Sequence, residues 1–126
     1  MQTKPVVWFE VYVQDMMRAK AFYEAVFSMQ LEKLEGPDSS EEMWAFPGPM
    51  DDSMGSSGAL VKMNGVLSGG NGVIVYFTCK DCATEASRVA SNGGKVTKEK
   101  FSLGKFGFAA LIADTEGNVI GLHSMQ

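Results

Sequence analysis

Hydrophobic and polar residues alternate along several short stretches of the chain, and this alternation is typical of β-strands with one buried face. The first such stretch is "VVWFEVYV", residues 6–13, which is rich in β-branched and aromatic side chains. Alternation gives this strand one purely apolar face, formed by Phe9, Val11 and Val13. Its other face is aromatic with a carboxylate at its centre, and consists of Trp8, Glu10 and Tyr12. We expect the apolar face to pack beneath a helix.

A helix is predicted directly after this strand. Asp15 stands where an N-cap belongs, because its carboxylate can accept hydrogen bonds from the free amides of a first helical turn. The following segment, "MMRAKAFYEAVF", repeats its apolar residues at helical spacing. Three strands are then expected at residues 29–35, 41–47 and 58–63. The loop at 47–57 is rich in glycine and serine and is the best candidate for a mobile lid.

The same pattern then begins again. Residues 73–79, "VIVYFTC", predict a strand, Asp81 is placed to cap a second helix, and Gly93 and Gly94 end that helix. Further strands are expected at about 95–101, 107–113 and 118–124. The two halves superpose with an offset of 66 residues, so that Asp15 matches Asp81. A repeat of strand, helix and three strands indicates two half-sheets that each need a partner to complete a core.

Composition narrows the kinds of partner that the chain can have. Its 126 residues suit one domain with one hydrophobic core. The net charge is −4, so we do not expect binding to nucleic acid, which requires a basic surface. No apolar run approaches the roughly 18 residues that span a bilayer, and the first ten residues lack the features of a signal peptide. We expect a soluble, cytoplasmic protein with no membrane partner.

Two strings in this pattern resemble the vicinal oxygen chelate superfamily, which includes glyoxalase I, bleomycin-resistance proteins and extradiol dioxygenases. "FEVYVQDMMRAKAFYEAVF" looks like the opening strand, V-x-D turn and A-x-x-F-Y helix of the family. "GFAALIADTEGNVIGLHS" looks like its closing D-x-x-G-N-x-I-x-L hairpin. The chain is most similar to the small glyoxalase-like branch.

The resemblance implies an α+β fold. Two paired βαβββ modules would form an open, cup-shaped mixed β-sheet with helices on its outer face. We expect a single glyoxalase-like domain over residues 1–126, with module one at about 1–64 and module two at about 72–126.

The metal site of the family is expected to be lost in this chain. Family members hold a divalent metal in the cup through four side chains, and the metal acts as a Lewis acid. Alignment on the motifs places these four positions at Trp8, Ile74, Gly121 and either Ala59 or Leu60. None of these side chains is a metal ligand. The resemblance therefore implies no ordinary metal-dependent glyoxalase I activity, and we expect no cofactor.

Glu10 and His123, the single histidine, are the candidate catalytic pair. Glu10 lies two residues beyond Trp8, and His123 lies two residues beyond Gly121, so alternation places both on the cup side. In the family the first and last strands of different halves run close together, which would allow a metal-free acid–base pair. The structural alternative is a buried hydrogen bond that orders the floor of the cup. A shifted metal site on the same two residues is less favoured, because the pattern offers no third ligand.

Aromatic side chains on the cup-facing strands predict a pocket with apolar walls and polar tips. The candidate ligand-binding residues are Trp8, Tyr12, Tyr76, Thr78 and, if its strand presents it inward, Trp44. Plain core packing is the alternative for each ring. By resemblance, Lys105 and Phe106 lie at the rim of the cup, where they would contact a ligand. A solvated turn is the commoner role for such a pair.

Cys79 and Cys82 form a C-x-x-C pair at a predicted strand-to-helix junction. A helix N-terminus lowers the pKa of a thiol, so a redox role is one hypothesis. Cys79, however, takes the helix-facing position that Val13 holds in the first half. We therefore favour a structural pair, since free cysteine commonly behaves as a small buried hydrophobic residue.

Three functions follow from these patterns. The first is a glyoxalase-like lyase or isomerase whose chemistry depends on Glu10 and His123. The second is a metal-free binding protein, similar to the bleomycin-resistance branch, that sequesters a small organic molecule in a cup shared by two chains. The third is an adaptor with a vestigial, filled cup. Family precedent also implies a homodimer.

Overall fold

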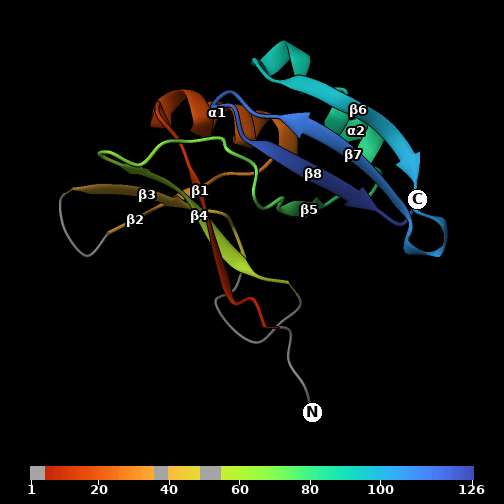
Figure 1. The fold of residues 1–126 in the computed structure, drawn as a ribbon, viewed down its shortest axis with the longest axis horizontal. Helices are drawn as coiled ribbons and strands as arrows, with labels where there is room; N and C mark the ends of the chain where they lie inside the picture. The colour runs from red at the N-terminus through yellow and green to blue at the C-terminus, as the bar shows by residue number, and fades with distance from the viewer. Residues whose placement is uncertain (1–4, 36–39, 49–54) are drawn as a thin grey trace.

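The computed structural model describes residues 5–35, 40–48 and 55–126 (Figure 1). The elements of its first half are β1 (Trp8–Tyr12), α1 (Met16–Phe27), β2 (Glu32–Leu34), β3 (Glu41–Ala45) and β4 (Ser57–Met63). Its second half consists of β5 (Tyr76–Thr78), α2 (Cys82–Ala86), the 3₁₀ turn η1 (Ala90–Asn92), β6 (Lys95–Ser102), the 3₁₀ turn η2 (Gly104–Phe106), β7 (Phe108–Ala113) and β8 (Val119–Ser124). The predicted repeat of strand, helix and three strands is therefore present. Most of the predicted lid, residues 49–54, lies outside the described residues.

Each half forms a four-stranded mixed sheet with the same strand order. Sheet A has the order β1-β4-β3-β2, and sheet B has the equivalent order β5-β8-β7-β6. In each sheet the first and last strands of the half pair in parallel, and the remaining neighbours pair antiparallel. The fold class predicted from the sequence, an α+β protein of two βαβββ units with open mixed sheets, is thus confirmed.

Both helices begin where the sequence places their caps. The Asp15 carboxylate accepts from the Arg18 amide at 3.1 Å, and the Asp81 carboxylate accepts from the Ala83 amide at 3.0 Å. The second helix is shorter than predicted, because its regular part ends at Ala86. The next turns are held by polar side chains instead: the Ser87 hydroxyl donates to the Thr84 carbonyl, and the Asn92 amide donates to the Arg88 carbonyl. Such side-chain bonds compete with regular helix.

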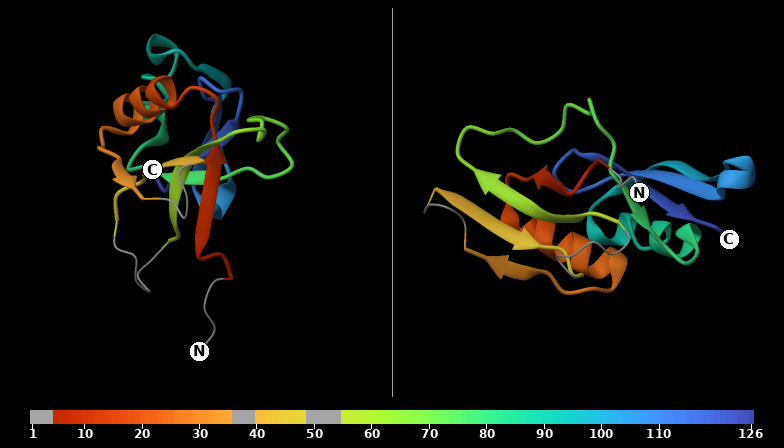
Figure 2. Two further views of the ribbon diagram at one scale, coloured as in Figure 1. Left: turned by 90° about the vertical axis from the view of Figure 1, so that its left-hand side faces the viewer. Right: turned by 90° about the horizontal axis from the view of Figure 1, so that it is seen from below.

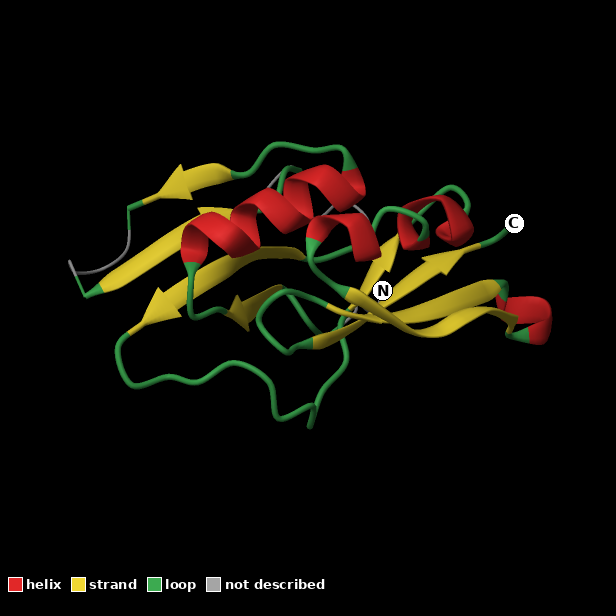
Figure 3. Cartoon of the chain, turned by 90° about the horizontal axis from the view of Figure 1, so that it is seen from above, coloured by secondary structure: helices red, strands yellow, loops and turns green. Residues whose placement is uncertain are grey.

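One hydrophobic core joins the two halves through α1. Tyr23 is fully buried, and its ring packs within 6 Å of the rings of Phe46, which follows β3, and of Phe77 in β5. The hydroxyl of Tyr23 donates to the Asp114 carboxylate at the end of β7, at 2.7 Å. Figure 3 shows the helices on the same side of both sheets. The helices therefore cover one face of each sheet and leave the other face open.

The predicted alternation along β1 is confirmed. Val11 and Val13 belong to the helix-covered core and Phe9 packs against it. On the opposite side, Trp8 and Tyr12 pack against a smaller buried cluster of Met43, Ala59 and Val61. We call this side of sheet A its open face. In the right-hand view of Figure 2 the strands of sheet A lie in front of α1. Because α1 contacts the covered sides of both sheets, the two sheets share one helical layer, and each keeps an open face on its other side.

No helix within the described ranges is both long and apolar enough to cross a membrane.

Candidate functional site

The open face of sheet A holds an exposed carboxylate between two aromatic side chains. Strand alternation brings Trp8, Glu10 and Tyr12 to the same side of β1. The Tyr12 hydroxyl donates to Oε1 of Glu10 at 2.7 Å, and the indole Nε1–H of Trp8 donates to Oε2 at 3.1 Å. The hydrogen bond to Glu10, burial, and the charges of Glu10 and Glu41 raise the pKa of Tyr12 to about 12. The tyrosine therefore remains a hydrogen-bond donor, and Glu10 is held in a fixed position.

A cavity of about 210 Å³ adjoins this carboxylate. Its floor comes from the second half of β1, which contributes Glu10 and Tyr12, and from residues 118–120 at the start of β8. Its roof is the connection between the two halves, residues 67–75, which runs in green from the end of β4 past β1 to β5 in Figure 1. The cavity therefore lies at the junction of the two halves.

Hydrogen bonds hold the roof of the cavity to the β7–β8 turn. The amide of Gly69 donates to the side-chain oxygen of Asn118 at 2.7 Å, and the Ser68 hydroxyl donates to the Glu116 carbonyl at 2.6 Å. Asn71 accepts from the Val119 amide. Asn118 also donates to the carbonyl of Tyr12 at 2.9 Å, which fixes the end of β1. The cavity is thus preformed, as is usual for small-molecule sites.

The open face of sheet B has a different chemistry. Strand pairing aligns Tyr76 with Gly121 and Thr78 with His123. The ring of Tyr76 lies directly over Gly121, because a Cβ at position 121 would approach the ring to 2.2 Å. Tyr76 and Thr78 are both exposed. This face is therefore accessible.

His123 has a partner that the sequence did not predict. Its Nε2 lies 2.7 Å from the carbonyl oxygen of Phe106. Since a carbonyl oxygen only accepts, Nε2 carries a proton and donates. The imidazole thereby fastens the 104–106 turn to β8. We find no hydrogen bond between His123 and Glu10, whose own oxygens are used by Trp8 and Tyr12. The two residues lie on different open faces, so one chain does not form the predicted acid–base pair.

Trp44 does not lie on the open face. It packs against the core on the helix-covered side of β3, with the Lys20 amine 4.8 Å from its ring centroid and its indole N–H bonded to Glu42. Trp44 was a candidate only if its strand presented it to the cup, and that condition is not met. The pairing of β3 with β4 explains the difference, because Met43 and Ala45 take the open side. Lys105 and Phe106 are both exposed in a turn, where the lysine amine stacks on the phenyl ring.

The two cysteines have the properties of structural residues. Both are free thiols; Cys82 is fully buried and Cys79 is half-buried against the core. Burial and the nearby charge of Glu85 raise the pKa of Cys79 to about 12. A redox nucleophile requires a lowered pKa, so the shift is in the wrong direction for that role.

The residues at the family's metal positions do not fit a metal. Trp8, Ile74, Gly121 and Ala59 offer no oxygen, sulfur or imidazole ligand, and the ring of Tyr76 occupies the space beside Gly121. In the described part of the chain, no group of three or more histidine, cysteine, aspartate or glutamate side chains is arranged to hold a metal ion.

Two parts of this site were not predicted from the sequence. The sequence of the connection at 67–75 predicts only a flexible loop, and it gives no indication that this loop lies over β1. Asn118 carried a signal, since it lies in the D-x-x-G-N motif of the closing hairpin. Its role, which is to join β1, the connection and the β7–β8 turn, depends on contacts between residues about 50 to 100 positions apart.

Two βαβββ units, each with an open mixed sheet, and a small cavity at their junction define a class of paired-module proteins. Within this class the chain belongs to the Glyoxalase/Bleomycin resistance protein/Dioxygenase superfamily, whose model matches residues 6–122. The resemblance inferred from the sequence is thereby confirmed. No curated protein sequence matches the chain.

Solved structures with the same fold include enzymes and binding proteins. Glyoxalase I from Zea mays, in its V278E mutant form, is 22% identical with a TM-score of 0.73, and covers 96% of this chain and 46% of its own. The chain thus spans about half the length of the maize protein. TnmS3, an antibiotic binding protein from Streptomyces sp. CB03234, is 25% identical with a TM-score of 0.69, and covers 98% of both chains. A glyoxalase/bleomycin resistance protein from Albidiferax ferrireducens is 20% identical with a TM-score of 0.67. The match covers 96% of this chain and 98% of the Albidiferax chain.

Proposed function

We propose that this protein binds a small organic molecule without the metal of its superfamily, and does not act as a metal-dependent glyoxalase. The observation that carries the proposal is the fixed Trp8–Glu10–Tyr12 group beside a preformed cavity. The absence of ligand side chains at the four metal positions supports it. The match to TnmS3 over nearly the full length of both chains is consistent with a binding role.

Binding is favoured over catalysis because the two residues proposed for acid–base chemistry serve other purposes within a chain. His123 donates to a backbone carbonyl, and Glu10 accepts from two neighbours on its own strand. A vestigial, filled cup is not supported either, since the open faces expose aromatic side chains such as Tyr76, which is 51% exposed.

We propose further that two copies of the chain associate, so that the open face of sheet A in one copy completes a cup with the open face of sheet B in the other. The two open faces belong to separate four-stranded sheets, and in this proposal each supplies half of a cup. Large apolar side chains are exposed beside these faces, both before β1 and along the 67–75 connection. They are Val6, Val7, Leu67 and Val73, with exposed fractions of 60%, 78%, 80% and 79%.

The proposal is tested by metal analysis combined with ligand screening. Protein purified without chelator is analysed by mass spectrometry for metal content, together with the variants Glu10→Gln and His123→Ala. We expect substoichiometric metal in all three, and ligands that stabilise the protein in a thermal screen to do so equally well in the presence of EDTA. A near-stoichiometric metal that the variants lose, or ligand binding that EDTA abolishes, would contradict the proposal.

A further inference from the structure

The cavity beneath residues 67–75 carries one charge. Of the described residues that line it, Glu10 is the only charged one, and the others are apolar side chains, glycines, hydroxyl groups and amides. Among the described residues Glu10 forms no ion pair, and a carboxylate in this state favours a positively charged ligand group. We propose that this cavity binds a small organic ammonium ion whose nitrogen pairs with Glu10. The inference rests on the proposed binding function and adds the chemical class of the ligand.

Glu10 has free positions at which it can accept a hydrogen bond from a ligand. The hydrogen bonds from Trp8 and Tyr12 use one position on each oxygen, whereas a carboxylate has about four acceptor positions. These two donors fix the orientation of the carboxylate without neutralising its charge. Tyr12 also lines the cavity, and aromatic side chains attract ammonium groups.

The walls of the cavity suit the hydrocarbon part of such a ligand. Leu67, Val73, Val75 and Val119 line it, and the first two are largely exposed in the absence of a ligand. Its volume of about 210 Å³ lies below the roughly 300–1,000 Å³ of typical ligand clefts, which limits the occupant to a small molecule. A bare metal ion is a poor alternative, because a single carboxylate does not provide the oxygen ligands that such an ion requires.

The test compares three probes of similar shape and different charge: phenethylamine, 2-phenylethanol and phenylacetate. Their binding to the full chain is measured by isothermal titration calorimetry in the presence of EDTA. We expect the amine to bind about tenfold more tightly than the alcohol, because it forms a charge-assisted hydrogen bond at a partly exposed site. The acid is expected to bind more weakly than both. Raising the salt concentration should weaken binding of the amine and leave binding of the alcohol unchanged.

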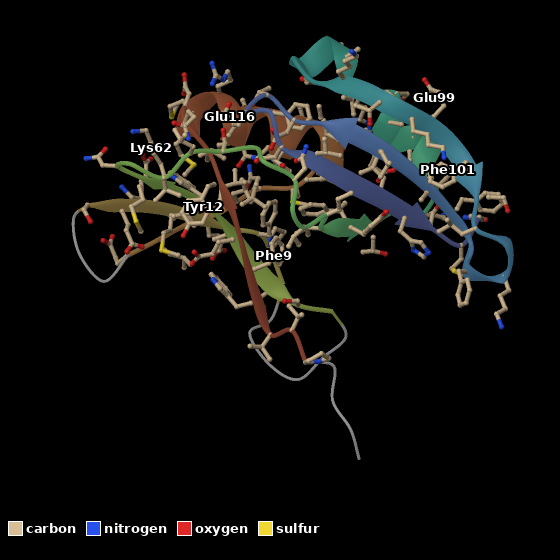
Figure 4. The ribbon with its side chains drawn as sticks, in the orientation of Figure 1. Phe9, Tyr12, Lys62, Glu99, Phe101 and Glu116 are labelled. Carbon is tan, nitrogen blue, oxygen red and sulfur yellow. The ribbon has the colours of Figure 1, made fainter. Side chains whose placement is uncertain are left out.

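Two variants locate the charge that selects the ligand. Glu10→Gln keeps the size of the side chain and removes its charge, so the amine should bind no better than the alcohol. Glu99→Gln makes the same change of charge on β6, at the far side of the molecule from Tyr12 (Figure 4), and should leave the preference intact. Thermal unfolding of both variants confirms that each is folded.

Equal affinity for the amine and the alcohol, a preference for phenylacetate, or a preference that survives Glu10→Gln would overturn the inference. In the first of these outcomes the proposed binding function stands, because a neutral ligand still binds without metal. Loss of all binding on addition of EDTA contradicts the proposed function instead, whatever the order of the three probes.

Discussion

Glu116, in the turn between β7 and β8, accepts hydrogen bonds from residues nearly 100 positions earlier in the chain. The amides of Gln14 and Asp15 donate to its carboxylate at 2.8 and 2.9 Å. The guanidinium of Arg18, in the first turn of α1, donates to both of its oxygens at 2.7 and 3.0 Å. The Glu116 side chain is fully buried, whereas that of Arg18 is about half exposed. A single carboxylate, labelled in Figure 4, therefore anchors the start of α1 to the turn between β7 and β8.

These contacts determine how Glu116 ionises. Burial opposes the charged form, but the hydrogen bonds from Arg18, the Asp15 amide, Thr115 and the Gln14 amide outweigh it and lower the pKa to about 2. Because the pKa in the folded state lies below the ordinary value of 4.5, the ionised carboxylate stabilises the fold. This contribution is complete above pH 4.5 and is lost as the pH falls from 4.5 towards 2.

The variant Glu116→Gln tests this contribution. The neutral amide loses the ion pair with Arg18, so we expect the free energy of unfolding to fall by about 2 kcal/mol at pH 7. The difference between wild type and variant should shrink as the pH falls below 4.5. Chemical unfolding at several pH values measures both effects, with Glu99→Gln as an exposed control. If wild type and variant lose the same free energy of unfolding below pH 4.5, the pH dependence comes from groups other than Glu116.

At the scale of elements, α1 is the part that fixes the arrangement of the two sheets. One of its faces buries Met16, Ala19, Phe22, Tyr23 and Val26. Tyr23 packs against aromatic rings from both halves, and Phe22 approaches Gly94 so closely that a Cβ there would lie 2.6 Å from its ring. The helix therefore acts as a shared layer, and its burial determines which face of each sheet stays open.

Tyr23→Phe tests the polar part of this junction. The buried hydroxyl donates to Oδ2 of Asp114, which would retain only the longer bond from Asn118 at 3.1 Å. We expect a loss of about 2 kcal/mol in the free energy of unfolding, since a buried charged acceptor is left partly unsatisfied. Tyr76→Phe is the matched control, because its ring is half exposed and should change stability by less than about 0.5 kcal/mol. Denaturant titration compares the two, and equal effects would refute a special role for the Tyr23 hydroxyl.

For the whole molecule, the main question is whether one chain or two form the ligand site. Sheets A and B share a helical layer and each leaves its other face open, and apolar residues are exposed near β1 and the 67–75 connection. Exposed apolar residues in such a cluster are typical of a protein–protein contact.

Val7→Glu tests the proposed association. Val7 is 78% exposed directly before β1, so a charge there should disfavour burial in a dimer and leave the fold of the monomer intact. Light scattering should give twice the chain mass of 13.6 kDa for the wild type and a shift towards that mass for the variant. Met17→Glu serves as control, because Met17 is equally exposed, at 74%, but lies on α1. A monomeric wild type, or dissociation by both variants alike, would contradict the proposal.

The sequence by itself determined the features that depend on neighbours along the chain. Alternation assigned the two faces of β1, Asp15 and Asp81 marked both helix starts, and the repeat revealed two equivalent sheets. The motifs also placed the chain in its superfamily. Each of these depends on side-chain period or local hydrogen bonding, which a single sequence records directly.

Only the tertiary structure decided how these parts face one another. The strand pairing placed Glu10 and His123 in different sheets, where Glu10 bonds with Trp8 and Tyr12 and the imidazole bonds with the carbonyl of Phe106. The register of β3 with β4 turned Trp44 towards the helix. The cavity beside Glu10 exists because Asn118 ties the 67–75 connection to β1. These outcomes depend on contacts between distant residues, and the alternation of a strand carries no information about which other element its face will meet.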